Sequence, residues 1–196
     1  MLVRMRIIAG QFRSRTLVAP SGLATRPTSD RLRETLFNVL ARRIQGAAFL
    51  DLYAGSGAVG IEALSRGAAS VAFVERVPAA LAALRANLAK LGIGEGFRIH
   101  TGSVGGWLRR SEGGSSQTFD LVFLDPPYDA AEEYAATLRI LGEAPGILAP
   151  GALVIAEHRR KQSLDDRYGS LKRTRLLEQG DAALSFYETA PSPTDG

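Results

Sequence analysis

The run Asp125-Pro126-Pro127-Tyr128 combines, within four positions, the groups needed to receive a planar amino group. Two consecutive prolines fix φ twice and lack N–H donors, so they predict a rigid, extended exit from the apolar stretch 121–124. The Asp125 carboxylate and the Pro126 carbonyl would then accept the two N–H bonds of an amino group, and the Tyr128 ring would stack on the ring that bears it. We therefore take Asp125, Pro126 and Tyr128 as candidate catalytic residues.

A glycine-rich loop at residues 51–57, DLYAGSG, is the second candidate site. Together with Gly60, its two glycines form the spacing G-x-G-x-x-G, which is typical of nucleotide-binding turns but also occurs in turns that bind no ligand. Gly55 and Gly57 let the backbone turn sharply and approach a ligand closely, because no Cβ intervenes. We expect that valine at Gly57 would obstruct the ligand and leave the core intact.

Glu75 ends an apolar run about 20 residues beyond the glycine loop, where a carboxylate can accept hydrogen bonds from both hydroxyls of a ribose. A phosphate-containing dinucleotide and an adenosyl cofactor both fit this arrangement, and a solvated carboxylate at a strand end is the alternative. His100 and His158 are possible general bases, but structural or surface roles are favoured for both. Trp107 is expected to pack in the interior.

Alternation of short apolar runs with helical patterns predicts the elements that position these groups. The expected strands are 47–53, 70–76, 97–103, 120–127 and 152–158. The expected helices are 58–66, 77–91, 131–142 and a shorter one at 104–110. Such alternation indicates an α/β fold with a parallel sheet covered by helices on both faces. Residues 171–179 and 182–189 are expected to form an antiparallel hairpin at the sheet edge.

Residues 1–43 are expected to form a basic arm of a small hairpin and a helix, followed by the core at 44–190 and a disordered tail at 191–196. The helix is expected over 30–43, with its N-cap at one of residues 28–30. Its apolar face consists of Leu32, Leu36, Phe37, Leu40 and Ile44.

Charge is concentrated in the arm, where nine arginines face only two acidic residues, for a net charge of +7. The whole chain has a net charge of +4, so the remainder is acidic. A basic segment of this kind suggests a surface for a polyanion such as nucleic acid, although arginines can also decorate a solvated face. A second basic cluster, Arg159-Arg160-Lys161, could contact phosphates or remain solvated.

The composition excludes several other classes of protein. The chain has 196 residues, of which 45% are hydrophobic and 22% charged, which is typical of one soluble domain with a sizeable core. The absence of cysteine excludes disulfides and thiolate chemistry, and two histidines make a metal site unexpected. No apolar run approaches the roughly 18 residues of a membrane span. We expect a cytoplasmic protein with no metal and no membrane partner.

The glycine loop and the Asp125–Tyr128 motif together resemble class I S-adenosylmethionine-dependent methyltransferases of the branch that modifies amino groups. Two stretches of the arm, RIIAG at 6–10 and TRPTSDRLRETLFN at 25–38, are similar to the bacterial 16S ribosomal RNA guanine-N2 methyltransferase family, the small-subunit rRNA methyltransferase D family. This resemblance runs from Arg6 to about Glu188. It implies a Rossmann-like, seven-stranded, mostly parallel sheet with a C-terminal antiparallel hairpin.

The resemblance also implies a cofactor, S-adenosylmethionine, and the residues that would hold it. The residues expected around it are Asp51, Tyr53, Ala54, Gly55, Ser56, Gly57, Glu75, Arg76, Ser103 and Asp125. Within this set, Glu75 would hold the ribose hydroxyls. Many relatives hold the adenine amino group with an acidic residue after the third strand, but residues 101–104 contain no carboxylate, so Ser103 or backbone amides would replace it. The Asp125–Tyr128 motif would receive the target guanine.

The implied partner is 16S ribosomal RNA, in an assembled or nearly assembled small subunit, bound by a monomer. The residues expected to contact RNA are Arg6, Arg13, Arg15, Arg26, Arg31 and Arg33. Another amino methyltransferase, acting on DNA adenine or on a protein glutamine amide, is the alternative enzyme. A non-catalytic RNA-binding assembly factor is the alternative of a different class.

Overall fold

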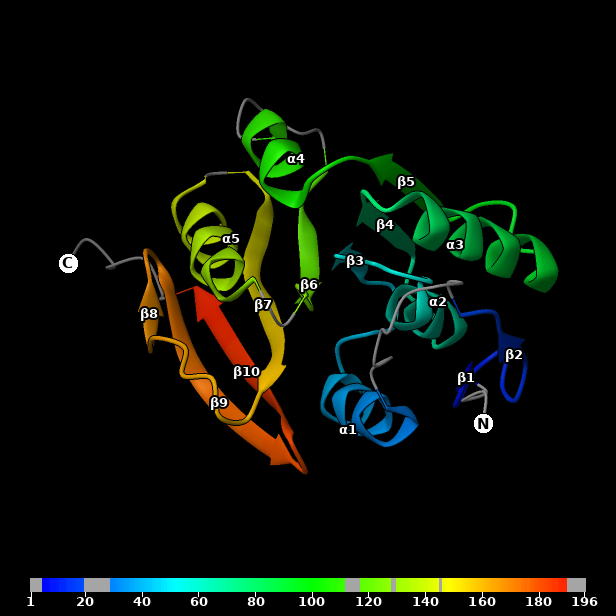
Figure 1. The fold of residues 1–196 in the computed structure, drawn as a ribbon, viewed down its shortest axis with the longest axis horizontal. Helices are drawn as coiled ribbons and strands as arrows, with labels where there is room; N and C mark the ends of the chain where they lie inside the picture. The colour runs from blue at the N-terminus through cyan, green and yellow to red at the C-terminus, as the bar shows by residue number, and fades with distance from the viewer. Residues whose placement is uncertain (1–4, 20–28, 112–116, 128–129, 145, 190–196) are drawn as a thin grey trace. The chain divides into compact units, whose positions relative to one another are not determined.

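The structure is a computed structural model that describes residues 5–19, 29–111, 117–127, 130–144 and 146–189. These residues form two compact units, one within Met1–Val104 and the other within Gly105–Gly196 (Figure 1). Arg26, Tyr128 and the tail 191–196 lie outside the described residues. In the described part of the chain, no helix is long and apolar enough to cross a membrane.

Three parallel strands form the centre of the first unit, in the order β5-β4-β3. They are β3 (Ala48–Leu52), β4 (Ser70–Glu75) and β5 (Phe97–Thr101). Two helices, α2 (Ala58–Ser65) and α3 (Pro78–Leu91), connect successive strands, as parallel pairing requires. Because β3 and β4 carry apolar side chains on both faces, nearly all of their residues are buried.

The N-terminal arm belongs to the first unit and contains α1 (Asp30–Leu40), β1 (Met5–Arg6) and β2 (Thr16–Leu17). Ser29 is the N-cap of α1, because its hydroxyl accepts a hydrogen bond from the Leu32 N–H at 3.1 Å. The helix ends earlier than Arg43, since the next residues form tight turns back to Asn38 and Leu40. The hairpin pairs only two residues of each strand, and most of its backbone hydrogen bonds go to turns and to α2.

The second unit is built on β6 (Phe119–Leu124), which is parallel to β7 (Leu148–Arg159). Beyond β7 the sheet continues antiparallel, in the order β10-β9-β8. These strands are β8 (Arg167–Tyr168), β9 (Leu171–Gln179) and β10 (Ala182–Thr189). The helix α4 (Val104–Ser111) precedes β6, and α5 (Ala131–Glu143) connects β6 to β7 and packs against β8 and β9.

The predicted α/β fold class is confirmed, because every expected strand and helix of the core is present. The hairpin at 171–179 and 182–189 has the expected bounds. The sequence missed β8, a two-residue strand that pairs with the start of β9, and it placed the start of β7 four residues too late. Trp107 is buried as expected, and its ring lies 6.2 Å from that of Phe119.

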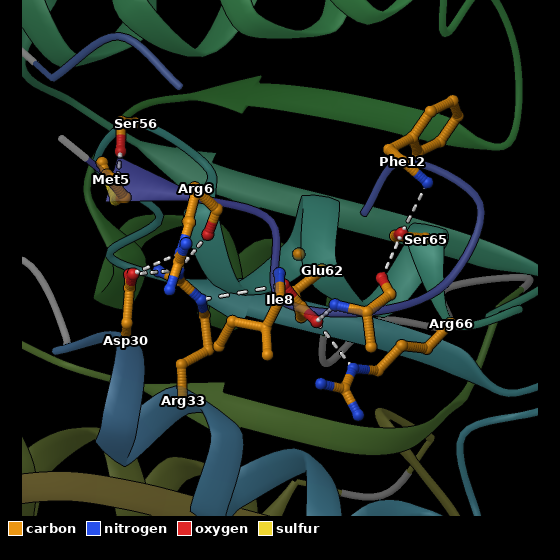
Figure 2. A network of polar contacts seen from close by, with 12 residues as sticks. Met5, Arg6, Ile8, Phe12, Asp30, Arg33, Ser56, Glu62, Ser65 and Arg66 are labelled. Atoms are coloured by element: carbon orange, nitrogen blue, oxygen red, sulfur yellow. Dashed lines mark hydrogen bonds and ion pairs between the residues drawn. The ribbon is translucent and has the colours of Figure 1, made fainter. Parts of the chain in front are cut away.

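A buried carboxylate, that of Glu62 in α2, holds the arm on the first unit (Figure 2). Its two oxygens accept hydrogen bonds from the backbone N–H groups of Ile8 and Ala9 at 2.8 and 3.0 Å. Arg66, the C-cap residue just after α2, donates its Nε–H to the same carboxylate at 2.7 Å. These contacts attach the turn after β1 to α2, so the arm is part of this unit's folded structure.

Arg33 of α1 has no exposed surface and completes this buried network (Figure 2). Its Nε lies 3.8 Å from a Glu62 oxygen, and its Nη2 donates to Asp30 at 2.9 Å and to the Arg6 carbonyl. The expectation that Arg33 contacts RNA is therefore wrong. A guanidinium without exposed surface cannot reach a phosphate, and in this position it stabilises the arm.

Replacing Glu62 with glutamine should destabilise the protein. The amide oxygen offers fewer acceptor sites than the carboxylate, and the buried Arg33 charge loses a counter-ion. Breaking a buried pair on one side costs about 3–5 kcal/mol, so we expect Glu62→Gln to lower the free energy of unfolding by about 3 kcal/mol in urea denaturation. The matched control, Glu34→Gln on the exposed side of α1, should stay within about 0.5 kcal/mol of the wild type. Equal effects in the two variants would contradict the role given to Glu62.

Candidate active site

The connection from β3 to α2 turns sharply through residues in the left-handed region of backbone conformation. Tyr53 has φ of 61°, Gly55 of 56° and Gly57 of 80°. Glycine adopts this conformation freely, but a tyrosine there costs on the order of 1–2 kcal/mol. A non-glycine residue held in this region is a feature that concentrates at ligand-binding turns. The loop therefore stores strain where the sequence predicts the cofactor.

Asp51, the penultimate residue of β3, is buried beneath this loop and 2% exposed. It accepts a hydrogen bond from the Gly60 N–H at 2.9 Å and so satisfies a donor in the first turn of α2, whose N-cap residue provides no side-chain bond. Burial raises the pKa of Asp51 to about 8; the Gly60 hydrogen bond opposes this rise, and the nearby Glu75 charge adds to it. Asp51 is thus a buried carboxyl that holds its proton near neutral pH.

Glu75, the last residue of β4, closes the loop from the neighbouring strand. One of its carboxylate oxygens accepts the Gly55 N–H at 2.8 Å, and the other accepts the N–H groups of Arg76 and Val77 at 2.7 and 2.8 Å. A carboxylate has about four acceptor sites, so capacity remains on the oxygen that binds Gly55. Glu75 fixes the loop conformation, and its predicted contact with ribose hydroxyls stays a prediction.

The glycines of the loop have different steric roles, which corrects one expectation. A Cβ at Gly57 would lie 2.3 Å from Cδ1 of Leu84, a fully buried residue of α3, so valine there would clash with the core. A Cβ at Gly60 would lie 2.3 Å from the Phe73 ring, which shows that this glycine permits close packing of α2 on the sheet. A Cβ at Gly55 would meet nothing within 4 Å. Gly55 is therefore the position at which the backbone faces open space.

Asn87 of α3 connects the glycine loop to the arm, a contact that was not predicted from the sequence. Its fully buried side-chain amide donates to the Ser56 carbonyl at 3.0 Å and to the Val18 carbonyl at 3.0 Å, and accepts the Val18 N–H at 2.7 Å. Ser56 is itself buried, and its hydroxyl contacts the Met5 sulfur at 4.0 Å (Figure 2). The sequence pattern that could have identified Asn87 is an amide side chain on the helix face that also carries Leu84, Leu88 and Leu91.

The remaining residues expected around the cofactor differ in exposure. Ala54 is buried and donates its N–H to the Val74 carbonyl at 3.1 Å, whereas Arg76 is exposed. Ser103 is exposed in the connection between β5 and α4. The preceding Gly102 donates its N–H to the Glu75 carbonyl at 2.9 Å, which fixes this connection to the end of β4. All the predicted cofactor residues other than Asp125 thus belong to the first unit.

In the second unit, Asp125-Pro126-Pro127 directly follows β6. Asp125 is half-buried, Pro126 is buried and Pro127 is exposed. The buried hydroxyl of Tyr134, in α5, donates to the Glu157 carbonyl at 2.9 Å and lies 3.4 Å from the Pro126 carbonyl. Because a carbonyl has two lone pairs, this weaker contact restrains the Pro126 oxygen and leaves it able to accept another bond.

His158 is buried at the end of β7, as its favoured structural role requires. Its Nε2 lies 2.9 Å from the Ser185 hydroxyl and its Nδ1 2.9 Å from the Arg159 carbonyl. Burial lowers the pKa of His158, which favours the neutral imidazole. His100 is half-buried in β5. A neutral histidine with both ring nitrogens engaged is a packing element of the second unit.

Several arginines of the arm remain exposed. The exposed side chains among those expected to bind RNA are Arg6, Arg13, Arg15 and Arg31. Arg6 pairs with Asp30, with 3.4 Å between Nε and Oδ2, and Arg15 donates to the Lys90 carbonyl at 3.4 Å. Exposed ion pairs contribute little to stability, so these side chains can exchange partners at low cost. Their contact with RNA stays a prediction.

Three features together define a Rossmann-like fold of the methyltransferase class. A strained glycine loop connects the first strand and helix of a parallel unit, and an acidic residue ends the next strand. A later strand is followed directly by Asp-Pro-Pro. Comparison with known proteins agrees with this assignment. The chain belongs to the family described as Conserved hypothetical protein 95, whose model matches residues 5–188.

Named relatives and solved structures cover most of the chain. It is 36% identical over 187 residues to ribosomal RNA small subunit methyltransferase D of Escherichia coli strain K12, covering 94% of this chain and 90% of the relative. The solved structure of yhhF, a candidate methyltransferase of Escherichia coli, matches with a TM-score of 0.81 and 35% identity over 95% of this chain and 98% of that one. A protein of Thermus thermophilus matches with a TM-score of 0.78 and 31% identity over 92% and 97% of the two chains.

The raised pKa of Asp51 predicts a pH dependence of stability. Between about pH 4 and pH 8 the folded protein retains a proton that the unfolded chain, with the ordinary value of 3.8, releases. Asp51 therefore makes the free energy of unfolding fall as pH rises through this window, by at most about 1.4 kcal/mol per pH unit. We therefore expect the free energy of unfolding of Asp51→Asn, taken relative to that of the wild type, to rise as the pH is raised from 5 to 8. Urea unfolding at each pH measures this difference.

The control for this experiment is Asp120→Asn, which changes an exposed carboxylate of β6. Its difference from the wild type should stay constant over the same pH range. A constant difference for Asp51→Asn as well would show that Asp51 titrates alike in the folded and unfolded states.

Proposed function

We propose that this protein transfers a methyl group from S-adenosylmethionine to the exocyclic N2 amino group of a guanine in 16S ribosomal RNA. The observation that carries the proposal is the turn after β6, where Asp125 is half-buried and the adjacent Pro126 carbonyl lies 3.4 Å from the Tyr134 hydroxyl. The Asp125 carboxylate and the Pro126 carbonyl would supply two acceptors. Two acceptors match the two N–H bonds of an amino group. The name of the Escherichia coli relative, ribosomal RNA small subunit methyltransferase D, supports ribosomal RNA as the substrate class.

The residues around the β3–α2 loop fit the proposed cofactor. Gly55 offers backbone without a side chain, and Glu75 retains acceptor capacity for a ribose hydroxyl. Asp51 lies beneath the same loop as a buried carboxyl. A cationic ligand beside it would lower its pKa, since a nearby positive charge favours the charged form, and its proton would pass to solvent. Ser103 and the backbone beside it would take the adenine side, because residues 101–104 contain no carboxylate.

The chemical work of the protein is to orient the amino group and to remove its proton. When bound, S-adenosylmethionine supplies an electrophilic methyl group on its sulfonium. Asp125 and the Pro126 carbonyl would hold the amino group with its nitrogen lone pair aimed away from the guanine ring, and they would stabilise the positive charge that develops on nitrogen. Asp125 would then accept the proton. Tyr128, by its place in the motif, would stack on the base.

The arm would supply affinity for RNA, and the shape of the substrate would supply specificity. Arg13, Arg15 and Arg31 are exposed, and arginines that contact phosphates position a protein without reading sequence. The described part of the arm is also fastened to α2 and α3 by Glu62 and Asn87, so it presents a fixed surface. A fixed surface suits RNA that is already folded, which favours an assembled or nearly assembled small subunit as the substrate.

The cofactor site is tested by adding a methyl group where the loop faces open space. We expect Gly55→Ala to weaken S-adenosylmethionine binding about tenfold, or about 1.4 kcal/mol, in calorimetry. Gly46→Ala is the matched control, because Gly46 also has a positive φ (74°) and a Cβ there meets nothing within 4 Å. Both variants should lose about 1 kcal/mol of stability through backbone strain, and only the first should lose cofactor affinity. Unchanged affinity in Gly55→Ala would move the cofactor elsewhere.

The reaction is tested with small ribosomal subunits from cells that lack this enzyme, followed by mass spectrometry of the nucleosides. The wild type should produce N2-methylguanosine in 16S ribosomal RNA. Asp125→Ala should bind the cofactor with near-normal affinity and lose turnover by roughly 10²-fold or more. Asp120→Ala, an exposed carboxylate of the same strand region, should remain active.

Three results would argue against the proposal. Near-normal turnover in Asp125→Ala would make the Asp-Pro-Pro turn a structural feature. Methylation of adenine or of a protein glutamine, with no product on guanine, would replace the substrate. Cofactor binding absent from the wild type would favour a non-catalytic RNA-binding factor.

A further inference from the structure

We propose that the exposed end of β7 and the turn that follows it, Arg159, Arg160 and Lys161, called here the β7 turn, are a second surface for RNA phosphates beside the Asp125 acceptor. This inference rests on the proposed function and deepens it, because it assigns part of the substrate contact to the second unit. The sequence singled out this cluster, and neither the arm nor the cofactor loop includes it.

The register of the sheet brings the β7 turn to the edge at which Asp125 lies. In the parallel pair β6 and β7, Leu124 is opposite Ala156, and both strands run toward the same edge (Figure 1). β6 ends at Leu124, whereas β7 continues to Arg159. With strands about 4.8 Å apart and a rise of about 3.3 Å per residue, the turn begins roughly 10 Å from the end of β6. Phosphates flanking a base held at Asp125 would lie within reach of such long side chains.

The backbone of the β7 turn is fixed while its side chains are exposed. The Arg160 N–H donates to the Asp181 carbonyl at 2.8 Å, and the Gln162 N–H donates to the Arg159 carbonyl at 2.9 Å. All three cationic side chains are exposed, directly after the buried run that ends at His158. Among the residues that the structure describes, neither Arg160 nor Lys161 forms an ion pair. A fixed backbone that presents exposed cations is suited to binding an anionic ligand.

The neighbouring charges limit the ligand to a small number of phosphates. Glu178 and Asp181 are also exposed, on the adjoining β9–β10 hairpin, so two carboxylates belong to the same region as the three cations. Two carboxylates beside the cations disfavour a long acidic partner laid across the whole edge. One or two phosphates at the β7 turn itself remain favourable, because a guanidinium donates two parallel hydrogen bonds to a phosphate and a lysine adds a point charge.

Such contacts would position the target nucleotide and leave base recognition to Asp125. Phosphate contacts fix register and orientation, whereas base contacts select the base. The arm contributes its exposed arginines from the first unit, and the β7 turn contributes cations from the unit that carries the amino-group acceptor. The substrate backbone would thus be held in the same unit that orients its base.

The test compares the double variant Arg160→Ala/Lys161→Ala with the control Arg109→Ala/Arg110→Ala. The control removes two exposed arginines from the last turn of α4, in the same unit. Binding to small subunits from cells lacking this enzyme is measured from 50 to 200 mM salt. Each lost phosphate contact should lower the slope of log affinity against log salt by somewhat under one unit, so the β7-turn variant should lose between one and two units and bind roughly tenfold more weakly.

In the β7-turn variant, cofactor affinity should match the wild type, and the control should keep the wild-type salt slope. An unchanged slope in the β7-turn variant, or an equal loss in the control, would overturn the proposal. If the wild type binds subunits without methylating them, the proposed function fails, and the difference in slope between the two variants still decides whether the β7 turn contacts RNA.

Discussion

The carboxylate of Glu62 fixes the geometry of the first unit, since three separate segments of the chain depend on it. It accepts backbone donors from the turn after β1, pairs with the guanidinium of Arg66 at the C-cap of its own helix and lies against the buried Arg33 of α1. The helix that carries it begins where the glycine loop ends. This buried carboxylate therefore ties two segments of the arm, the turn after β1 and α1, to the helix that supports the candidate cofactor site, and its burial is tolerated because each oxygen is engaged.

One side-chain amide and one hydroxyl fix the backbone of the candidate sites in a similar way. The side-chain amide of Asn87 forms hydrogen bonds with both the N–H and the carbonyl of Val18, as a neighbouring strand would. Its nitrogen also donates to the Ser56 carbonyl of the loop. In the second unit, the Tyr134 hydroxyl plays a similar role, because it donates to the Glu157 carbonyl and lies 3.4 Å from the Pro126 carbonyl. Neither residue is positioned to react. Both hold backbone groups in place where a ligand requires a preformed surface, and such preorganisation is what makes positioned dipoles effective.

The order of strands and helices could be predicted because apolar runs, prolines and glycines act locally. Gly92, for example, ends α3 in the left-handed conformation, as its place after the helical pattern indicates. Burial of single polar residues could not be predicted, because it depends on contacts between distant segments. Arg33 resembled its exposed neighbour Arg31, and only its contacts with Glu62 and the Arg6 carbonyl, far away in the sequence, distinguish the two. Gly57 was expected to face the ligand, yet its missing side chain makes room for Leu84 of a helix nearly thirty residues away.

The buried Asp51 also affects the net charge of the folded protein. Counting residues gives a net charge of +4 at neutral pH, with every aspartate ionised. In the folded state the pKa of Asp51 is about 8, so its proton remains bound and the net charge becomes about +5. A ligand that drives this proton off would return the charge to +4. Occupancy of the loop would then register as proton release to the buffer, a signal that distinguishes a cationic ligand from a neutral one.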